Sequence, residues 1–165
     1  MLTGALMVLA GRSNIVSLPA TPSNRFIKPT LQTKFHIDFD WWERETQTFR
    51  VYLMSHLCPE HQAAFATDAP LEMLDRVDTN TGEVLQIDSL QYTLGAHCAR
   101  QPEFLTPHLP LVDAVFRVLV ANGNQPLTPE ELAAAIQRPN QAQTILRTLA
   151  GPNQRVYKGL RPLLE

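Results

Sequence analysis

Proline is the residue that most constrains this chain, because thirteen prolines are spread through its 165 residues. Each proline fixes its own φ angle and lacks an amide hydrogen, so it ends or bends a helix and is excluded from the interior of a sheet. The helices and strands must therefore be short. The length suits one compact domain, or a small domain joined to a smaller one. A hydrophobic content of 44% with 18% charged residues indicates a globular protein and not a disordered one.

Charge and cysteine content exclude several classes of protein. Fourteen basic and sixteen acidic residues give a net charge of −2, whereas general polyanion binders are usually basic. Two cysteines are too few for the disulfide framework of a small secreted scaffold. The apolar first ten residues lack the positive start of a secretion signal and are shorter than the roughly twenty residues that cross a bilayer. We expect a cytoplasmic protein with no membrane partner, with Met7 as a second candidate for its true start.

Composition and periodicity divide the chain into three regions. Residues 1–33 have no sustained hydrophobic period and predict an extended N-terminal arm. Residues 34–104 alternate short strand and helix patterns, and residues 105–165 are mainly helical, with clustered prolines at the boundary. The predicted fold class is α+β, in which a small mixed domain of helices and a hairpin precedes a three-helix domain.

The mixed region opens with hydrophobic and polar residues that alternate over 35–42, the period of a half-buried strand. The predicted core face carries Phe35, Ile37, Phe39 and Trp41. The opposite face carries His36, Asp38, Asp40 and Trp42. A row of His and Asp could hold Mg²⁺ in a metal-dependent hydrolase, although solvated strand faces of this kind are far more common. Trp42 is expected to point away from the core, towards a covering helix or a partner.

The rest of the mixed region reads as helices around one hairpin. The predicted elements are a helix over 43–57, a helical turn over 59–66, two strands over 76–78 and 83–88, and a helix over 89–100. Asp88 or Ser89 is expected to cap the last helix.

Both cysteines of the chain have a histidine close by in the sequence. Cys58 and His61 form a C-x2-H pair, and His97 and Cys98 are adjacent near the end of the predicted helix. Zinc binds Cys and His in tetrahedral sets, so Cys58, His61, Cys98 and either His97 or His56 could form a structural zinc site. Adjacent residues on a helix point about 100° apart, which makes His97 and Cys98 an awkward pair. Alternatively, the cysteines are small buried hydrophobic residues and the histidines line a polar seam.

The last third carries the clearest helix signals. An apolar stripe at helical spacing predicts a buried helix over 111–122, ended by Gly123. The stripe consists of Leu111, Val115, Val118 and Leu119. The next helix has Thr128 as its cap, Pro129 at its first position and Glu131 three residues after the cap, which is the pattern of a capping box.

Asn140 is expected to cap a third helix, with Gly151 and Pro152 ending it. Its predicted core face is Ala142, Ile145, Leu146 and Leu149. A β-prone, basic tail follows. Three short helices and such a tail resemble the winged helix-turn-helix fold over roughly the last 55 residues.

In winged-helix proteins the third helix enters the DNA major groove and the wing contacts phosphate. The resemblance implies that the groove-facing residues are Gln141, Gln143, Thr144 and Arg147, and that the phosphate contacts are Arg155, Lys158 and Arg161. Gln can pair with adenine and Arg with guanine, so the side chains suit base recognition. The charge distribution also favours DNA binding by the last third, since residues 105–165 carry a net charge of +2 and residues 1–104 carry −4.

These patterns favour a non-enzymatic DNA-binding or transcription-associated protein. The sequence has no Gly-rich phosphate loop, G-x-S-x-G motif or H-E-x-x-H motif, which argues against an enzyme. Winged helices also serve as protein-binding or dimerisation modules, so an adaptor with a protein partner, or a homodimer, is the alternative.

Overall fold

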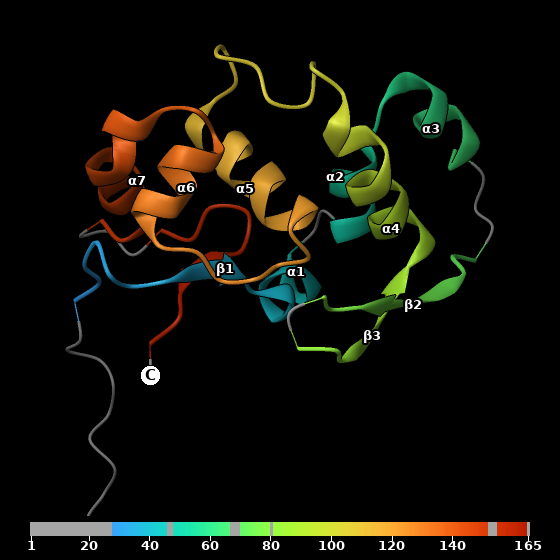
Figure 1. The fold of residues 1–165 in the computed structure, drawn as a ribbon, viewed down its shortest axis with the longest axis horizontal. Coiled ribbons are helices and arrows are strands. Elements are labelled where there is room, and N and C mark those ends of the chain that lie inside the picture. Colours follow the sequence, from blue (N-terminus) through green and yellow to red (C-terminus); the bar gives the residue numbers. More distant parts are fainter. Residues whose placement is uncertain (1–27, 46–47, 67–69, 80, 152–154, 165) are drawn as a thin grey trace, which may run out of the picture.

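The structure is a computed structural model, and it describes residues 28–45, 48–66, 70–79, 81–151 and 155–164. Over these residues the chain forms an α+β fold with seven α-helices and two small antiparallel sheets (Figure 1). This confirms the predicted fold class. Most of the predicted arm, residues 1–27, lies outside the described residues. Within the described part of the chain, no helix is long and apolar enough to cross a membrane.

The first sheet joins the two ends of the described chain. Strand β1 (Phe35–Ile37) pairs antiparallel with β4 (Leu160–Pro162). The backbone of Phe35 also pairs with that of Leu127, to which its amide donates at 2.8 Å. One cluster of buried side chains contains residues from both sides of position 105, so the buried core is continuous across the predicted domain boundary. A strand from the mixed region thus completes the packing of the helical region.

The strand predicted over 35–42 ends at Ile37, and that prediction is wrong beyond this point. The carboxylate of Asp38 accepts a hydrogen bond from the amide of Asp40 at 3.0 Å, which caps helix α1 (Phe39–Arg44). A helix has a different side-chain period from a strand, so His36, Asp38 and Asp40 do not form a row on one strand face. The prediction for Trp42 is also wrong, because its side chain belongs to the buried core cluster and is only 4% exposed.

The helix predicted over 43–57 is not one continuous helix. Its first residues belong to the end of α1, and a separate helix follows. Helix α2 (Phe49–Met54) has its own cap at Thr48, whose hydroxyl accepts a hydrogen bond from the amide of Val51 at 3.4 Å. Helix α3 (Pro59–Ala64) confirms the helical turn predicted after it. Short elements between caps and prolines are what the proline content predicts.

The hairpin is confirmed, and its first strand begins earlier than predicted. Strands β2 (Met73–Val77) and β3 (Val84–Asp88) pair antiparallel. Asp88 then caps helix α4 (Ser89–Ala96), since its carboxylate accepts a hydrogen bond from the amide of Gln91 at 2.7 Å. The helix ends before residue 100, and a single 3₁₀ turn, Cys98–Arg100, follows it.

The helices of the last third form largely as the sequence predicts. They are α5 (Leu111–Ala121), α6 (Pro129–Ala135) and α7 (Ala142–Leu149). Gly123 ends α5 with a φ of +75°, and the capping box of Thr128 and Glu131 is present at α6. The prediction of Asn140 as a cap is wrong, because Asn140 lies in a 3₁₀ turn and Gln141 occupies the cap position of α7.

Aromatic side chains join the two halves of the core. The ring of Trp42 stacks on that of Tyr52, with centroids 5.0 Å apart, and Tyr52 packs edge-on against Phe116 of α5 at 4.8 Å. The indole of Trp42 also donates a hydrogen bond to the carbonyl of Lys158 at 3.1 Å. In Figure 1, α5 lies between α6 and α7 on one side and α2 and α4 on the other. Helix α5 therefore lies at the centre of the packing and contributes buried side chains to the core.

Candidate metal centre

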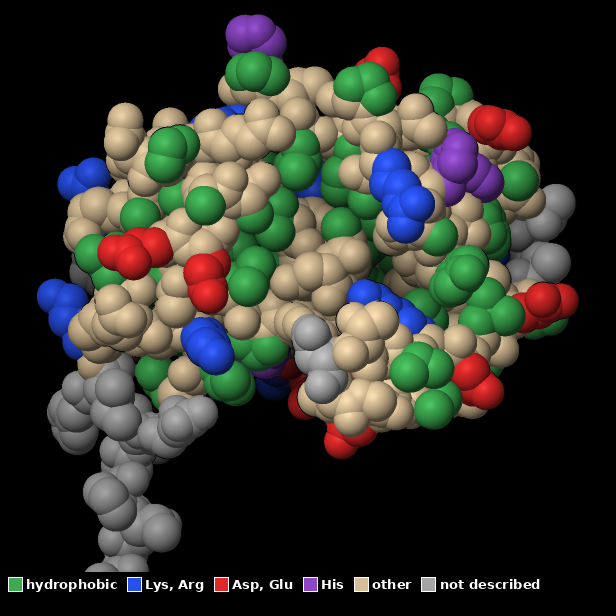
Figure 2. Space-filling model, viewed as in Figure 1, with side chains coloured by type: hydrophobic (Ala, Val, Ile, Leu, Met, Phe, Trp, Pro, Cys, Tyr) green, Lys and Arg blue, Asp and Glu red, His purple; other side chains and the backbone are tan. Residues whose placement is uncertain are grey.

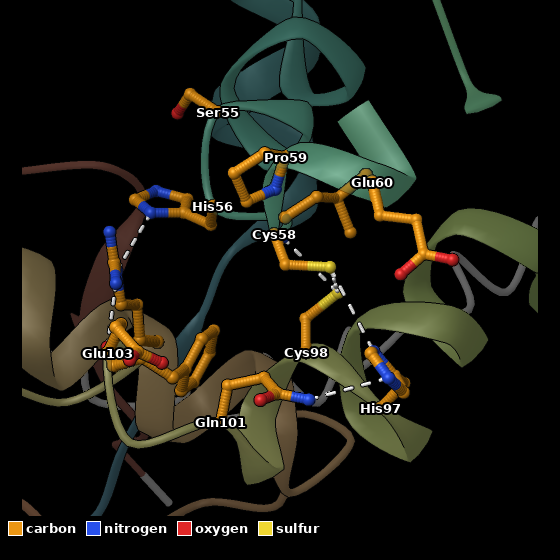
Figure 3. A pocket seen from close by; sticks show the side chains of 12 residues that line it. Ser55, His56, Cys58, Pro59, Glu60, His97, Cys98, Gln101 and Glu103 are labelled. Carbon is orange, nitrogen blue, oxygen red and sulfur yellow. Dashed lines mark hydrogen bonds between the residues drawn. The ribbon is translucent and has the colours of Figure 1, made fainter. Parts of the chain in front are cut away.

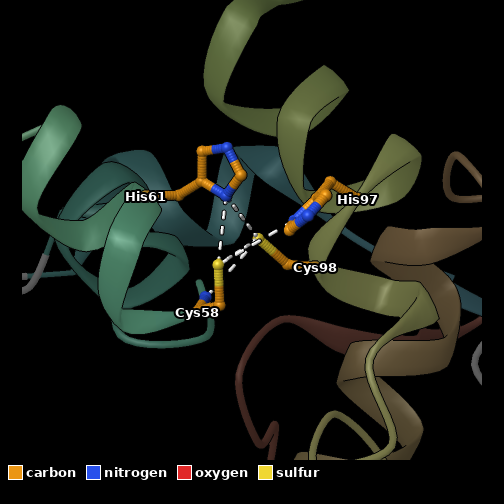
Figure 4. A group of neighbouring side chains, drawn as sticks. All are labelled: Cys58, His61, His97 and Cys98. Atoms are coloured by element: carbon orange, nitrogen blue, oxygen red, sulfur yellow. Dashed lines mark hydrogen bonds between the residues drawn. The ribbon is translucent and has the colours of Figure 1, made fainter.

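Four side chains from two separate segments converge beside the ends of α2 and α4 (Figure 4). They are Cys58, His61, His97 and Cys98, and one ligand atom from each lies within 4.8 Å of all the others. These are the four residues that the sequence singles out for a metal. They could hold a metal ion, because each offers a sulfur or imidazole nitrogen to the same small volume.

The first pair is positioned by the start of α3. Cys58 occupies the cap position of that helix, and Pro59 follows at its first position. His61 lies three residues later, close to one helical turn, so its ring returns to the side of Cys58. The Sγ atom of Cys58 lies 3.0 Å from Nδ1 of His61.

The second pair is positioned by the end of α4. His97 has a φ of −124° and a ψ of −62°, which departs from helical geometry, and the 3₁₀ turn begins at Cys98. Adjacent side chains on a regular helix would point apart. The irregular backbone at His97 removes this obstacle, and both side chains reach the same point (Figure 4). No propensity in the sequence marks this break.

Three distances between the ligand atoms are close to the edges of a zinc tetrahedron, and a fourth, the 3.0 Å between Sγ of Cys58 and Nδ1 of His61, is shorter. Zinc lies about 2.3 Å from sulfur and about 2.0–2.1 Å from nitrogen, so tetrahedral edges should measure about 3.8 Å between sulfurs and about 3.6 Å between sulfur and nitrogen. The two Sγ atoms are 3.6 Å apart. The Sγ of Cys98 lies 3.4 Å from Nδ1 of His61, and the Sγ of Cys58 lies 3.9 Å from Nδ1 of His97.

Burial and hydrogen bonding differ among the four ligands. Cys98 is only 2% exposed, and burial raises the pKa of its thiol. The amide of Cys58 points at the Sγ of Cys98 at 3.4 Å, a contact that stabilises a thiolate. His97 is exposed, and its Nε2 lies 3.4 Å from Nε2 of Gln101. The cluster thus has a buried side at Cys98 and a solvent side at His97.

His56, the alternative ligand in the sequence, belongs to a different network. Its Nδ1 accepts a hydrogen bond from Nε of Arg117 at 3.0 Å, and the same guanidinium donates to the carbonyl of Phe104 at 2.7 Å. His56 is 7% exposed, and burial lowers its pKa to about 4. Next to it, the hydroxyl of Tyr52 donates to Asp113 at 2.8 Å, and burial raises the pKa of Tyr52. His97 therefore completes the cluster.

A pocket of about 600 Å³ opens beside the cluster (Figure 3). Cys58, His97 and Cys98 form part of its wall, and Glu60 and Glu103 contribute carboxylates to it. Sequence reasoning missed this pocket, because its walls come from segments that only the tertiary packing brings together. It gives small solutes a route to both sulfurs.

The residues that the resemblance assigns to DNA are presented differently. On α7, Gln143, Thr144 and Arg147 are exposed, whereas Gln141 is half-buried at the cap. In the tail, Arg155 is exposed and its guanidinium lies 5.6 Å from the centroid of the Tyr157 ring.

The other two basic residues of the tail contact the first half of the chain. The ammonium of Lys158 lies 4.2 Å above the ring of Tyr52, and the guanidinium of Arg161 forms an ion pair with Asp38 at 3.0 Å. On the face in Figure 2, Lys and Arg side chains are scattered among acidic ones and do not gather into one patch.

Comparison with known protein families, curated proteins and solved structures gives no match for this chain. The evidence for a metal site and for a binding surface on α7 therefore comes from the geometry of this chain alone.

Proposed function

We propose that this protein binds one structural Zn²⁺ ion through Cys58, His61, His97 and Cys98. The observation that carries the proposal is the convergence of four ligand atoms within 4.8 Å, with three of the separations close to the edges of a zinc tetrahedron. Two thiolates and two imidazoles form a donor set of intermediate softness, which suits zinc better than Mg²⁺ or Ca²⁺.

A structural role follows from the number of protein ligands. Catalytic zinc keeps a position open for water or substrate, whereas four protein ligands complete the tetrahedral shell. In this chain the ion would join the start of α3 to the turn after α4, two segments that no disulfide links. Free thiols also favour a reducing compartment such as the cytoplasm.

The test is the metal content of protein purified without chelator. We expect about one equivalent of zinc per chain, and less than about half an equivalent would contradict the proposal. Replacing the ion by Co²⁺ should give the visible absorption of a tetrahedral cobalt–thiolate centre. Cys58→Ser should abolish both signals. His108→Asn, an exposed histidine outside the cluster, is the matched control and should retain both.

We further propose that this zinc-bound protein is a winged-helix, DNA-binding or transcription-associated protein. The supporting observation is the amphipathic α7, which buries Ile145 and Leu149 and presents Gln143, Thr144 and Arg147 to solvent. Residues of these types pair with base edges in the major groove. The order of α5, α6, α7 and a returning strand is the one expected of the winged-helix resemblance.

A salt series of binding to random duplex DNA tests this function. The logarithm of the affinity should fall linearly with the logarithm of the salt concentration, with a slope of about −0.9 for each phosphate contact. Only Arg155 is exposed among the three proposed phosphate contacts, so we expect a shallow slope. The absence of binding at low salt would favour the protein-binding adaptor, which the engagement of Lys158 and Arg161 within the fold also supports.

A further inference from the structure

We propose that Cys58 and Cys98 are a peroxide-sensitive pair, which closes into a disulfide and releases the metal. The inference rests on the proposed zinc site for its metal-release step. The proposed disulfide formation depends only on the positions of the two sulfurs and on their access to solutes.

The two sulfurs are placed for a bond between them. Their Sγ atoms are 3.6 Å apart, and a disulfide bond is about 2.05 Å long, so a small rotation of each side chain brings them together. They are the only two cysteines in the chain, so no other intramolecular disulfide is possible. Cys58 lies at the start of α3 and Cys98 in the turn after α4, which means that the bond would join the same segments as the ion.

The pocket gives an oxidant access to the pair. Both cysteines line the cavity of about 600 Å³, and hydrogen peroxide is far smaller than this space (Figure 3). Cys58 is half-buried, whereas Cys98 is 2% exposed. Peroxide should therefore attack Cys58 first, and Cys98 lies behind it as the resolving thiol.

The reaction uses one hydrogen peroxide and two thiolates. The Cys58 sulfur attacks one peroxide oxygen, so an S–O bond forms, the O–O bond breaks, and the leaving hydroxide takes a proton to become water. Cys98 then attacks the sulfur of the Cys58 sulfenic acid. An S–S bond forms, the S–O bond breaks, and a second hydroxide takes a proton to become water. The cysteines lose two electrons and peroxide gains them.

Metal release follows from the loss of both thiolates. A disulfide sulfur is a poor ligand for zinc, so only His61 and His97 would remain, and His97 is exposed to solvent. The covalent bond replaces the ion as the link between α3 and the turn after α4. We therefore expect oxidation to empty the site without unfolding the chain.

The experiment titrates the full zinc-loaded chain with hydrogen peroxide and follows zinc with a coloured chelator. We expect about one zinc to be released for about one peroxide consumed, with loss of both thiols. The intact mass should fall by two hydrogens, and a peptide map should show Cys58 linked to Cys98. Dithiothreitol followed by zinc should restore the starting protein.

Two variants resolve the order of the steps. Cys98→Ser should accumulate a sulfenic acid at Cys58 that dimedone traps, whereas Cys58→Ser should be trapped several-fold more slowly. The wild-type peptide map does not depend on the folding of either variant. Sulfinic acids without a cross-link, or a disulfide only between chains, would overturn the inference. If the purified protein contains no zinc and the disulfide still forms, the zinc proposal fails and the cysteine pair stands.

Discussion

The metal centre and the surface of α7 with the tail differ in how their polar side chains are held. In the metal centre, Cys58, His61, His97 and Cys98 turn towards one point from two segments. On α7, Arg147 faces solvent, while Lys158 and Arg161 in the tail contact Tyr52 and Asp38. An ion needs ligands that converge, whereas DNA needs an array of side chains that remain available. The fold itself brings the four candidate metal ligands together. Only some of the side chains proposed to contact DNA remain available to solvent.

The largest expected difference between the two regions is their response to zinc. Zinc at a thousand times its dissociation constant should stabilise the wild-type protein by about 4 kcal/mol, which corresponds to roughly 10 °C in melting temperature for a protein of this size. Cys98→Ser should melt at the same temperature with zinc or with chelator. The comparison is made within each variant, because the buried serine has its own cost.

Arg147→Ala, which alters only the surface of α7, is the matched control for this measurement. It should keep the full zinc-dependent shift. An equal response to chelator in wild type and Cys98→Ser would contradict the assignment of the cluster.

Trp42 joins α2 to the tail. Its side chain stacks on Tyr52 of α2 and donates to the carbonyl of Lys158 in the tail. Trp42→Ala removes a buried aromatic side chain and should reduce the free energy of unfolding by about 3–4 kcal/mol. Trp41→Ala, next to it and only half-buried, should cost less than half as much. Urea denaturation measures both, and equal costs would contradict the difference in burial between the two side chains.

The sequence predicts the last third better than the beginning of the mixed region, for a physical reason. Helix α6 is specified by its own capping box, and α5 by its own apolar stripe. Strand β1 instead depends on β4, a partner at the other end of the chain. The alternation over 35–42 indicated a strand, but the cap at Asp38 started a helix after three residues.

The candidate site was predictable in composition but not in geometry. The spacing of Cys58 and His61 along α3 indicates a pair of ligands, and cysteine beside histidine indicates the second pair. Which histidine completes the set depends on the irregular backbone at His97 and on the bond between His56 and Arg117. Arg117 belongs to α5, so its bond to His56 depends on tertiary packing that local sequence does not encode.

On the surface that we propose to contact DNA, Arg147 and Arg161 should behave differently. Arg147→Ala should weaken sequence preference more than it weakens binding to random DNA, because its exposed side chain on α7 is proposed to contact base edges. Arg161→Ala removes an ion pair with Asp38 whose two side chains are 41% and 20% exposed, so it should leave sequence preference unchanged and cost about 1 kcal/mol of stability. An equal loss of affinity for all DNA sequences in Arg147→Ala would contradict the assignment of this residue to the groove.

A similarly small effect is expected at the start of α6, which contains none of the four proposed metal ligands. The amide of Thr128 donates to the carboxylate of Glu131 at 2.8 Å, and the amide of Glu131 donates to the hydroxyl of Thr128 at 3.3 Å. Thr128→Ala should cost about 1 kcal/mol of unfolding free energy and leave the zinc content unchanged. A matched loss of zinc would mean that the two regions are coupled.

The stability that this cap contributes depends on pH, and the carboxyl group of Glu131 sets the direction of that dependence. Hydrogen bonds from Thr128 lower the pKa of this carboxyl in the folded chain. Because the folded pKa lies below the unfolded one, the unfolded chain binds more protons, and the stabilisation present at neutral pH is lost as the pH falls through both values. Wild type should therefore exceed Glu131→Gln in stability at pH of about 7 and approach it below a pH of about 4. A difference that stays constant with pH would show that the charge of Glu131 contributes nothing to the cap.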